Sequence, residues 1–93
     1  MSPFLWDEKK NARLKVGRGV SFEQAVVLLE RGNVLDIVEH PNSEQYPAQK
    51  IAILEIDGYA WLLPFIQSGD TFVLKTLIPS RKATKKYLGN RDA

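Results

Sequence analysis

The sequence QKIAILEIDGYAWLLPFIQ, residues 49–67, predicts an antiparallel β-hairpin at the centre of the fold. Two runs rich in aromatic and β-branched residues, 49–56 and 59–67, flank the dipeptide Asp57-Gly58, which is typical of a type I′ turn. Pro64 lies inside the second run and has no backbone N–H, so we expect a bulge or a locally unpaired edge there.

Two further strands are expected on either side of this hairpin. Residues 34–39 alternate between apolar and polar side chains, and the polar segment from His40 to Pro47 ends that strand as a loop. Ser68-Gly69-Asp70 predicts a tight turn into a fourth strand, 71–78, which Pro79 is expected to stop.

Helix signals lie at both ends of the chain. Asp7 can cap a helix over residues 8–16, which Gly17 and Gly19 end, and Ser21 with Gln24 forms a capping box for a second helix that ends at Gly32. The core face of the second helix is expected to carry Phe22, Ala25, Val26 and Leu29. Ser80 caps a short last helix. The order predicts one α+β domain, residues 1–93, with two N-terminal helices, a four-stranded antiparallel sheet and a short C-terminal helix, the helices covering one face.

The composition of the chain argues against several kinds of site and location. The 93 residues include no Cys and a single His, His40, so neither a disulfide framework nor a zinc site is expected. No apolar run is long enough to span a membrane, and Asp7 stands where a signal peptide would be apolar. We therefore expect a soluble cytoplasmic protein that needs no cofactor and has no membrane partner. His40 is interpreted as a surface loop residue.

Positive charge is concentrated at the two ends of the chain. The formal charge is +3 over residues 1–18, −5 over 19–79 and +4 over 80–93. If the two ends meet in space, they form a basic surface suited to nucleic acid or to an acidic protein segment. Alternatively, the cations only solvate two surface helices. In the last helix Arg81, Lys82, Lys85 and Lys86 are expected to face outward, and Ala83, Thr84, Tyr87 and Leu88 to dock on the sheet.

Two end motifs resemble a known family. WDEKKN (residues 6–11) with GVSFEQA (residues 19–25) resembles the opening "WDxxKN…HGVSFEEA" pattern of the BrnT family of toxins, and SRKAT (residues 80–84) resembles its "SARKAT" closing helix. The chain departs from the family pattern in four places. Arg18 stands at the family's His, Gln49-Lys50 where an Arg usually opens the second strand, Lys75-Thr76 where a basic residue is usual, and Pro79 at a Ser.

The resemblance implies a RelE-like fold and a type II toxin, a metal-independent ribonuclease that cleaves mRNA and inhibits translation. It also implies a cognate antitoxin, usually with a ribbon-helix-helix DNA-binding domain, which forms a hetero-oligomer with the toxin. In that reaction the RNA 2′-OH attacks the adjacent phosphate, which requires charge stabilisation and two proton transfers.

We assign site residues to that reaction as follows. Arg81 is the expected phosphate clamp, and Lys50 or Lys75 the second catalytic cation. Lys9, Lys10, Arg13 and Lys82 are expected to bind RNA. The alternative function is a non-catalytic basic module that binds an acidic protein partner or nucleic acid.

Overall fold

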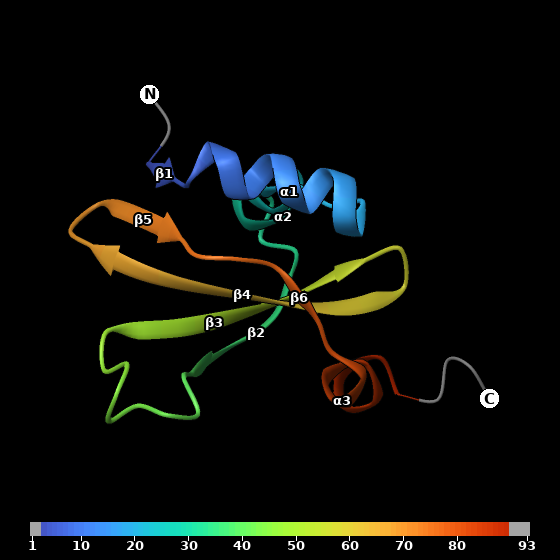
Figure 1. The fold of residues 1–93 in the computed structure, drawn as a ribbon. Coiled ribbons are helices and arrows are strands. Elements are labelled where there is room, and N and C mark those ends of the chain that lie inside the picture. The colour runs from blue at the N-terminus through green and yellow to red at the C-terminus, as the bar shows by residue number, and fades with distance from the viewer. Residues whose placement is uncertain (1–2, 90–93) are drawn as a thin grey trace.

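The computed structural model describes residues 3–89 (Figure 1). Its helices are α1 (Glu8–Arg18), α2 (Phe22–Glu30) and α3 (Arg81–Ala83), which continues into a π-helical turn, η1 (Thr84–Leu88). Its strands are β1 (Phe4–Leu5), β2 (Val34–Glu39), β3 (Gln49–Ile56), β4 (Tyr59–Ser68), β5 (Thr71–Leu74) and β6 (Ile78–Pro79). The α+β class expected from the sequence is confirmed.

The expected hairpin forms the centre of the sheet. The strands β3 and β4 pair without interruption from Gln49 opposite Ile66 to Ile56 opposite Tyr59. Asp57 and Gly58 both have positive φ, 53° and 80°, as a type I′ turn requires. Because glycine has no Cβ and Asp tolerates this region, the turn predicted from the dipeptide is confirmed.

The prediction of a four-stranded antiparallel sheet is wrong in two respects. The sheet has six strands in the order β1-β5-β4-β3-β2, with β6 paired to β4, and β1 runs parallel to β5. Two-residue strands are too short to give an alternating signal, so β1 and β6 could not be read from the sequence.

The expected fourth strand, 71–78, is broken by a bulge opposite Pro64. Leu74 pairs with Phe65 and Ile78 pairs with Leu62, so three residues, 75–77, lie opposite the two between them. The Lys75 N–H donates to the Pro64 carbonyl at 2.9 Å. Because proline has no N–H to donate, the regular pair of hydrogen bonds cannot form at this position. The irregularity expected at Pro64 therefore lies in the neighbouring segment, residues 75–77. The bulge lets Leu74 and Leu77 both enter the core.

Helices cover both faces of the sheet, so the prediction that they cover one face is wrong. Figure 1 shows α1 and α2 on one side and α3 on the other. Residues that alternate along β3 serve the two sides: Ala52 and Leu54 pack in the core beneath α1 and α2, whereas Ile51 and Ile53 pack with Ala83 and Leu88 of the C-terminal helix. A strand that is apolar on both faces needs cover on both.

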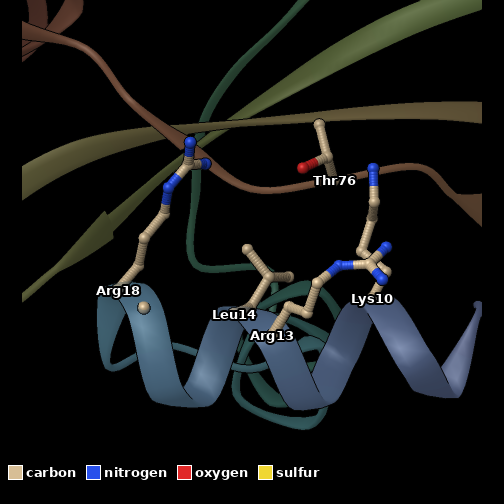
Figure 2. A pocket seen from close by; sticks show the side chains of 6 residues that line it. Lys10, Arg13, Leu14, Arg18 and Thr76 are labelled. Carbon is tan, nitrogen blue, oxygen red and sulfur yellow. The ribbon is translucent and has the colours of Figure 1, made fainter.

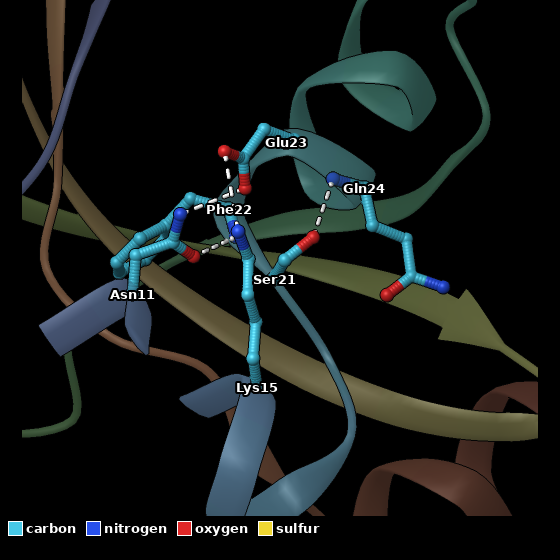
Figure 3. A network of polar contacts seen from close by, with 6 residues as sticks. All are labelled: Asn11, Lys15, Ser21, Phe22, Glu23 and Gln24. Atoms are coloured by element: carbon cyan, nitrogen blue, oxygen red, sulfur yellow. Dashed lines mark hydrogen bonds and ion pairs between the residues drawn. The ribbon is translucent and has the colours of Figure 1, made fainter. Parts of the chain in front are cut away.

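A buried asparagine joins the two N-terminal helices (Figure 3). Asn11 is 1% exposed; its Oδ1 accepts from the Phe22 N–H at 2.8 Å and its Nδ2 donates to Glu23 at 2.7 Å. The hydroxyl of Ser21 accepts from the Gln24 N–H at 3.1 Å, which is one of the two bonds of the expected capping box. Trp6 stacks on Phe22 with ring centroids 5.7 Å apart. These contacts fix the direction of α1 across the sheet.

Candidate nucleic-acid interface

Three cations of α1 converge on a hollow beside the β5–β6 bulge. The hollow has a volume of about 270 Å³ and is lined by Lys10, Arg13, Leu14, Gly17, Arg18 and Thr76. Figure 2 shows the three cationic side chains rising from one side of α1 toward the segment that carries Thr76. We call this set of lining residues the α1 hollow.

Helical spacing explains why these cations share one face. The five lining residues of α1 stand at i, i+3, i+4, i+7 and i+8, the pattern that an apolar stripe usually occupies. Here Leu14 alone supplies an apolar, buried side chain on that face. Gly17 leaves space, since a Cβ added to it would meet no atom within 4 Å. The helix therefore packs through few side chains and leaves a basic hollow beside them.

The bulge supplies the opposite wall. It brings Thr76 over the hollow, where the figure shows its hydroxyl on the inner side (Figure 2). The guanidinium of Arg18 donates to the carbonyl of Leu77, the last residue of the bulge. This bond holds the guanidinium of Arg18, an exposed residue, beside the bulge, and leaves its remaining N–H groups for a ligand.

The electrostatics of the α1 hollow favour an anion. Its lining includes three cations and no carboxylate. A second hollow, of about 330 Å³, adjoins it through Lys10 and is lined also by Trp6, Asp7 and Lys75. The Asp7 carboxylate caps α1 by accepting from the Lys9 N–H at 2.8 Å, so part of its charge is used locally. A hydroxyl with several cations is suited to phosphate oxygens.

The predicted RNA-binding residues divide between two faces of the molecule. Lys10 and Arg13 line the α1 hollow. Lys9 is exposed in the first turn of α1 and does not line it. Lys82 lies on α3, across the sheet, and borders a different groove. The two basic ends of the chain therefore do not form one surface.

The three residues predicted to be catalytic lie on separate parts of the fold: Arg81 begins α3, Lys50 is in β3 and Lys75 lies between β5 and β6. The Ser80 N–H donates to Ala60, which places Arg81 near that end of β4, whereas Lys50 pairs with Phe65. Ala60 and Phe65 are about 17 Å apart along β4, at ~3.3 Å per residue. Lys75 is in the bulge opposite Pro64. The structure brings Lys75 toward Lys10 but does not group it with Arg81 and Lys50, whose catalytic roles stay predictions.

The sequence-based assignment missed Arg18 and Thr76. Both were noted only as departures from the family pattern, at positions where that pattern has a His and a basic residue respectively. The structure places both at the α1 hollow. The departures from the family pattern could have pointed to these two residues. The sequence does not show, however, that the bulge faces α1 and brings them together.

Other chemistry has no comparable support in the described part of the chain. Among residues 3–89, no group of three His, Cys, Asp or Glu side chains could hold a metal ion. His40 accepts from the Asn42 N–H at 3.0 Å and packs against Tyr46, as a structural loop residue does. No helix within residues 3–89 has the length and apolar character needed to cross a bilayer.

Comparisons with known proteins give no relative for this chain. No protein-family model matches the sequence, and no curated protein and no solved structure matches it either. The BrnT resemblance therefore rests on the end motifs alone.

Proposed function

We propose that this chain is the toxin of a type II toxin–antitoxin pair, a metal-independent endoribonuclease with a RelE-like fold that cleaves mRNA and inhibits translation. The α1 hollow is the observation that supports it, because three cations and a hydroxyl surround a space that no carboxylate lines. The end motifs supply the reaction class, and a cognate antitoxin of the ribbon-helix-helix type is part of the same proposal.

The hollow suits the charge that develops in RNA transesterification. The RNA 2′-oxygen forms a bond to phosphorus, the bond to the 5′-oxygen breaks, and the products are a 2′,3′-cyclic phosphate and a free 5′-hydroxyl. Arg13 and Arg18 would stabilise the negative charge of the phosphorane, which is greater than that of the substrate. Thr76 and Lys10 would position the phosphate. The 2′-OH proton must pass to a base and another proton must reach the leaving oxygen.

Gly17 offers the sharpest test because its substitution changes the hollow without disturbing the core. It is helical, and an added side chain meets open space, so Gly17→Ala should fold at least as well as the parent protein. Gly17→Glu places a carboxylate among the three cations. We expect Gly17→Ala to arrest growth on induction and to cleave RNA in the presence of a chelator, and Gly17→Glu to lose more than about 100-fold of the cleavage rate.

Two results would contradict the proposal. Growth arrest and cleavage by Gly17→Glu at the parental rate would remove the hollow from the reaction. Absence of cleavage and of growth arrest in the parent protein would leave the non-catalytic binding module as the function. Arg81→Ala tests separately whether Arg81 is the phosphate clamp that the sequence predicts. Loss of toxicity in a folded Arg81→Ala protein would support that role.

A further inference from the structure

The sheet face opposite α1 and α2 is apolar and only partly covered. Cross-strand partners share a face, and three such rows lie on this side. The rows are Leu5, Val73 and Ile66; Pro64, Ile51 and Val38; and Ile78, Leu62 and Ile53. The cover consists of α3 and η1, eight residues at one end of the face. Leu5 and Ile78 are 54% and 39% exposed.

A groove runs between this face and the C-terminal helix. It has a volume of about 330 Å³, and its floor is made by apolar side chains of three strands, Val38, Ile51, Ile53 and Leu62. Ala83 and Tyr87 form the helical wall, and Lys82 and Lys86 stand on its rim four residues apart. Glu39 borders the groove from β2. We call these residues the α3 groove.

The charges around the groove select an acidic ligand. The helical segment carries Arg81, Lys82, Lys85 and Lys86, and no carboxylate occurs between residues 80 and 89. Asp36 of β2 does not line the groove, and its carboxylate is already engaged: it accepts from the Tyr87 hydroxyl at 2.6 Å and from the Ile37 N–H at 2.8 Å. The rim is therefore left positive, with Glu39 as its single bordering anion.

The two basic clusters differ in what lies between their cations. The α1 hollow has a threonine hydroxyl and a glycine backbone, a polar setting for phosphate. The α3 groove has a floor of valine, isoleucine and leucine, which gains nothing from a phosphate backbone and gains free energy from apolar side chains. We propose that the α3 groove binds a segment of a protein partner whose apolar side chains are flanked by acidic residues, and that RNA is not its ligand. The identification of this partner as the antitoxin rests on the proposed function. The binding preference of the groove does not, because it follows from the residues that line it.

Lys82 and Lys85 make a matched pair for the test. Both are exposed on the same eight-residue segment, but only Lys82 lines the groove. A library of random short peptides displayed on phage is selected against the full chain. We expect enriched peptides with Asp or Glu beside apolar residues, and a footprint on the amide NMR signals of Val38, Ile51 and Leu62. Lys82→Glu should weaken such a peptide about tenfold, and Lys85→Glu by less than about twofold.

Several results would overturn the proposal. These are enrichment without acidic residues, a footprint on α1, equal losses for Lys82→Glu and Lys85→Glu, or displacement of the peptide by single-stranded RNA. Failure to enrich any peptide would count against it as well. Gly17→Glu separates this proposal from the ribonuclease proposal, because it should abolish RNA cleavage and leave peptide binding unchanged.

Discussion

At the scale of single residues, most of the family-like motif is structural. Asp7 caps α1, and Asn11 accepts from the first turn of α2. In the closing motif Ser80 caps α3 by accepting from the Ala83 N–H at 3.0 Å. The Thr84 hydroxyl accepts from the Ala60 N–H at 2.9 Å and so fixes the helix to β4. These side chains accept from backbone N–H groups at helix starts and, in Ala60, at a strand. The motifs therefore report the fold more directly than they report catalysis.

Asn11 should be the most sensitive of these positions. Asn11→Leu keeps the side-chain size but leaves the buried Phe22 N–H without its acceptor. We expect the free energy of unfolding to fall by about 2–3 kcal/mol. The measurement is the urea midpoint and slope of the variant against those of the parent protein.

Lys15→Ala is the control for this prediction. It removes only the 3.6 Å ion pair with Glu23, whose two side chains are each about half exposed, and should cost less than about 0.5 kcal/mol. Equal losses in the two variants would contradict a special role for the Asn11–Phe22 hydrogen bond.

At the scale of elements, a carboxylate–phenol pair ties η1 to β2. The pKa of Asp36 lies below its ordinary value of 3.8, first because the Tyr87 hydroxyl donates to it and second because the Ile37 N–H does. The pKa of Tyr87 lies above its ordinary value of 10.0, chiefly because Asp36 holds its proton. The Lys86 ammonium lies 5.3 Å from the centroid of the Tyr87 ring. The Tyr87–Asp36 hydrogen bond therefore joins the C-terminal helix to the sheet on the side that this helix covers (Figure 1).

The pair should stabilise the fold only between two pH limits. A depressed carboxyl pKa means that the unfolded chain takes up a proton first, so the contribution is lost as pH falls below about 4. A raised phenol pKa means that the unfolded chain loses its proton first, so the contribution is also lost as pH rises above about 10. Tyr87→Phe should therefore lower Tm most at intermediate pH, and its curve should approach that of the parent protein at both extremes.

Tyr59→Phe is the control for the pH experiment. Tyr59 lies at the start of β4 on the other face, 36% exposed, so Tyr59→Phe removes a phenol hydroxyl without touching the Asp36–Tyr87 contact. A Tyr87→Phe difference that stays constant from acid to alkaline pH would mean that packing of the ring, and not its hydroxyl, carries the effect.

At the scale of the whole molecule, the sheet separates two positive surfaces. Cations are concentrated toward both ends of the chain, yet α1 and α3 lie on opposite faces of the sheet (Figure 1). One surface surrounds a polar hollow and the other an apolar groove. Although the net charge is only +2, the protein therefore has two separate basic sites of different character. This arrangement would let one protein hold RNA and a protein partner at the same time.

Salt dependence can distinguish one RNA surface from two. The probe is an RNA oligonucleotide whose 2′-hydroxyls are methylated, so that it is bound but not cleaved. If the protein makes three phosphate contacts, log K should fall with log salt concentration with a slope of about −2. Arg13→Ala should reduce the slope by about 0.7, and Lys82→Glu should leave it unchanged. Binding is measured by fluorescence anisotropy across a salt series. A reduction by Lys82→Glu as large as that of Arg13→Ala would join both faces into one RNA surface.

The boundaries of several elements could be predicted from the sequence because their signals are local. The expected end of the first helix at residue 16 was wrong, because α1 continues through Gly17 to Arg18 and is capped by Gly19. The strands 34–39 and 49–56 begin and end where expected, and α2 presents its predicted core residues Phe22 and Ala25. The candidate site was predicted only in part: Lys10 and Arg13 were named, and Arg18 was not. The position of the Arg18 side chain depends on a hydrogen bond to the carbonyl of Leu77, 59 residues away, which no local sequence pattern predicts.

The sequence by itself determined the α+β class, the type I′ turn at Asp57-Gly58 and the division of the last helix into a basic and an apolar side. Only the tertiary structure decided which face of the sheet each helix covers. The physical reason is that β3 is apolar on both faces, so alternation along the strand gives either helix layer a place to pack. The bulge opposite Pro64 and the short strand β6 then carry the chain to the far face. That route, rather than the distribution of charge along the sequence, separates the α1 hollow from the α3 groove.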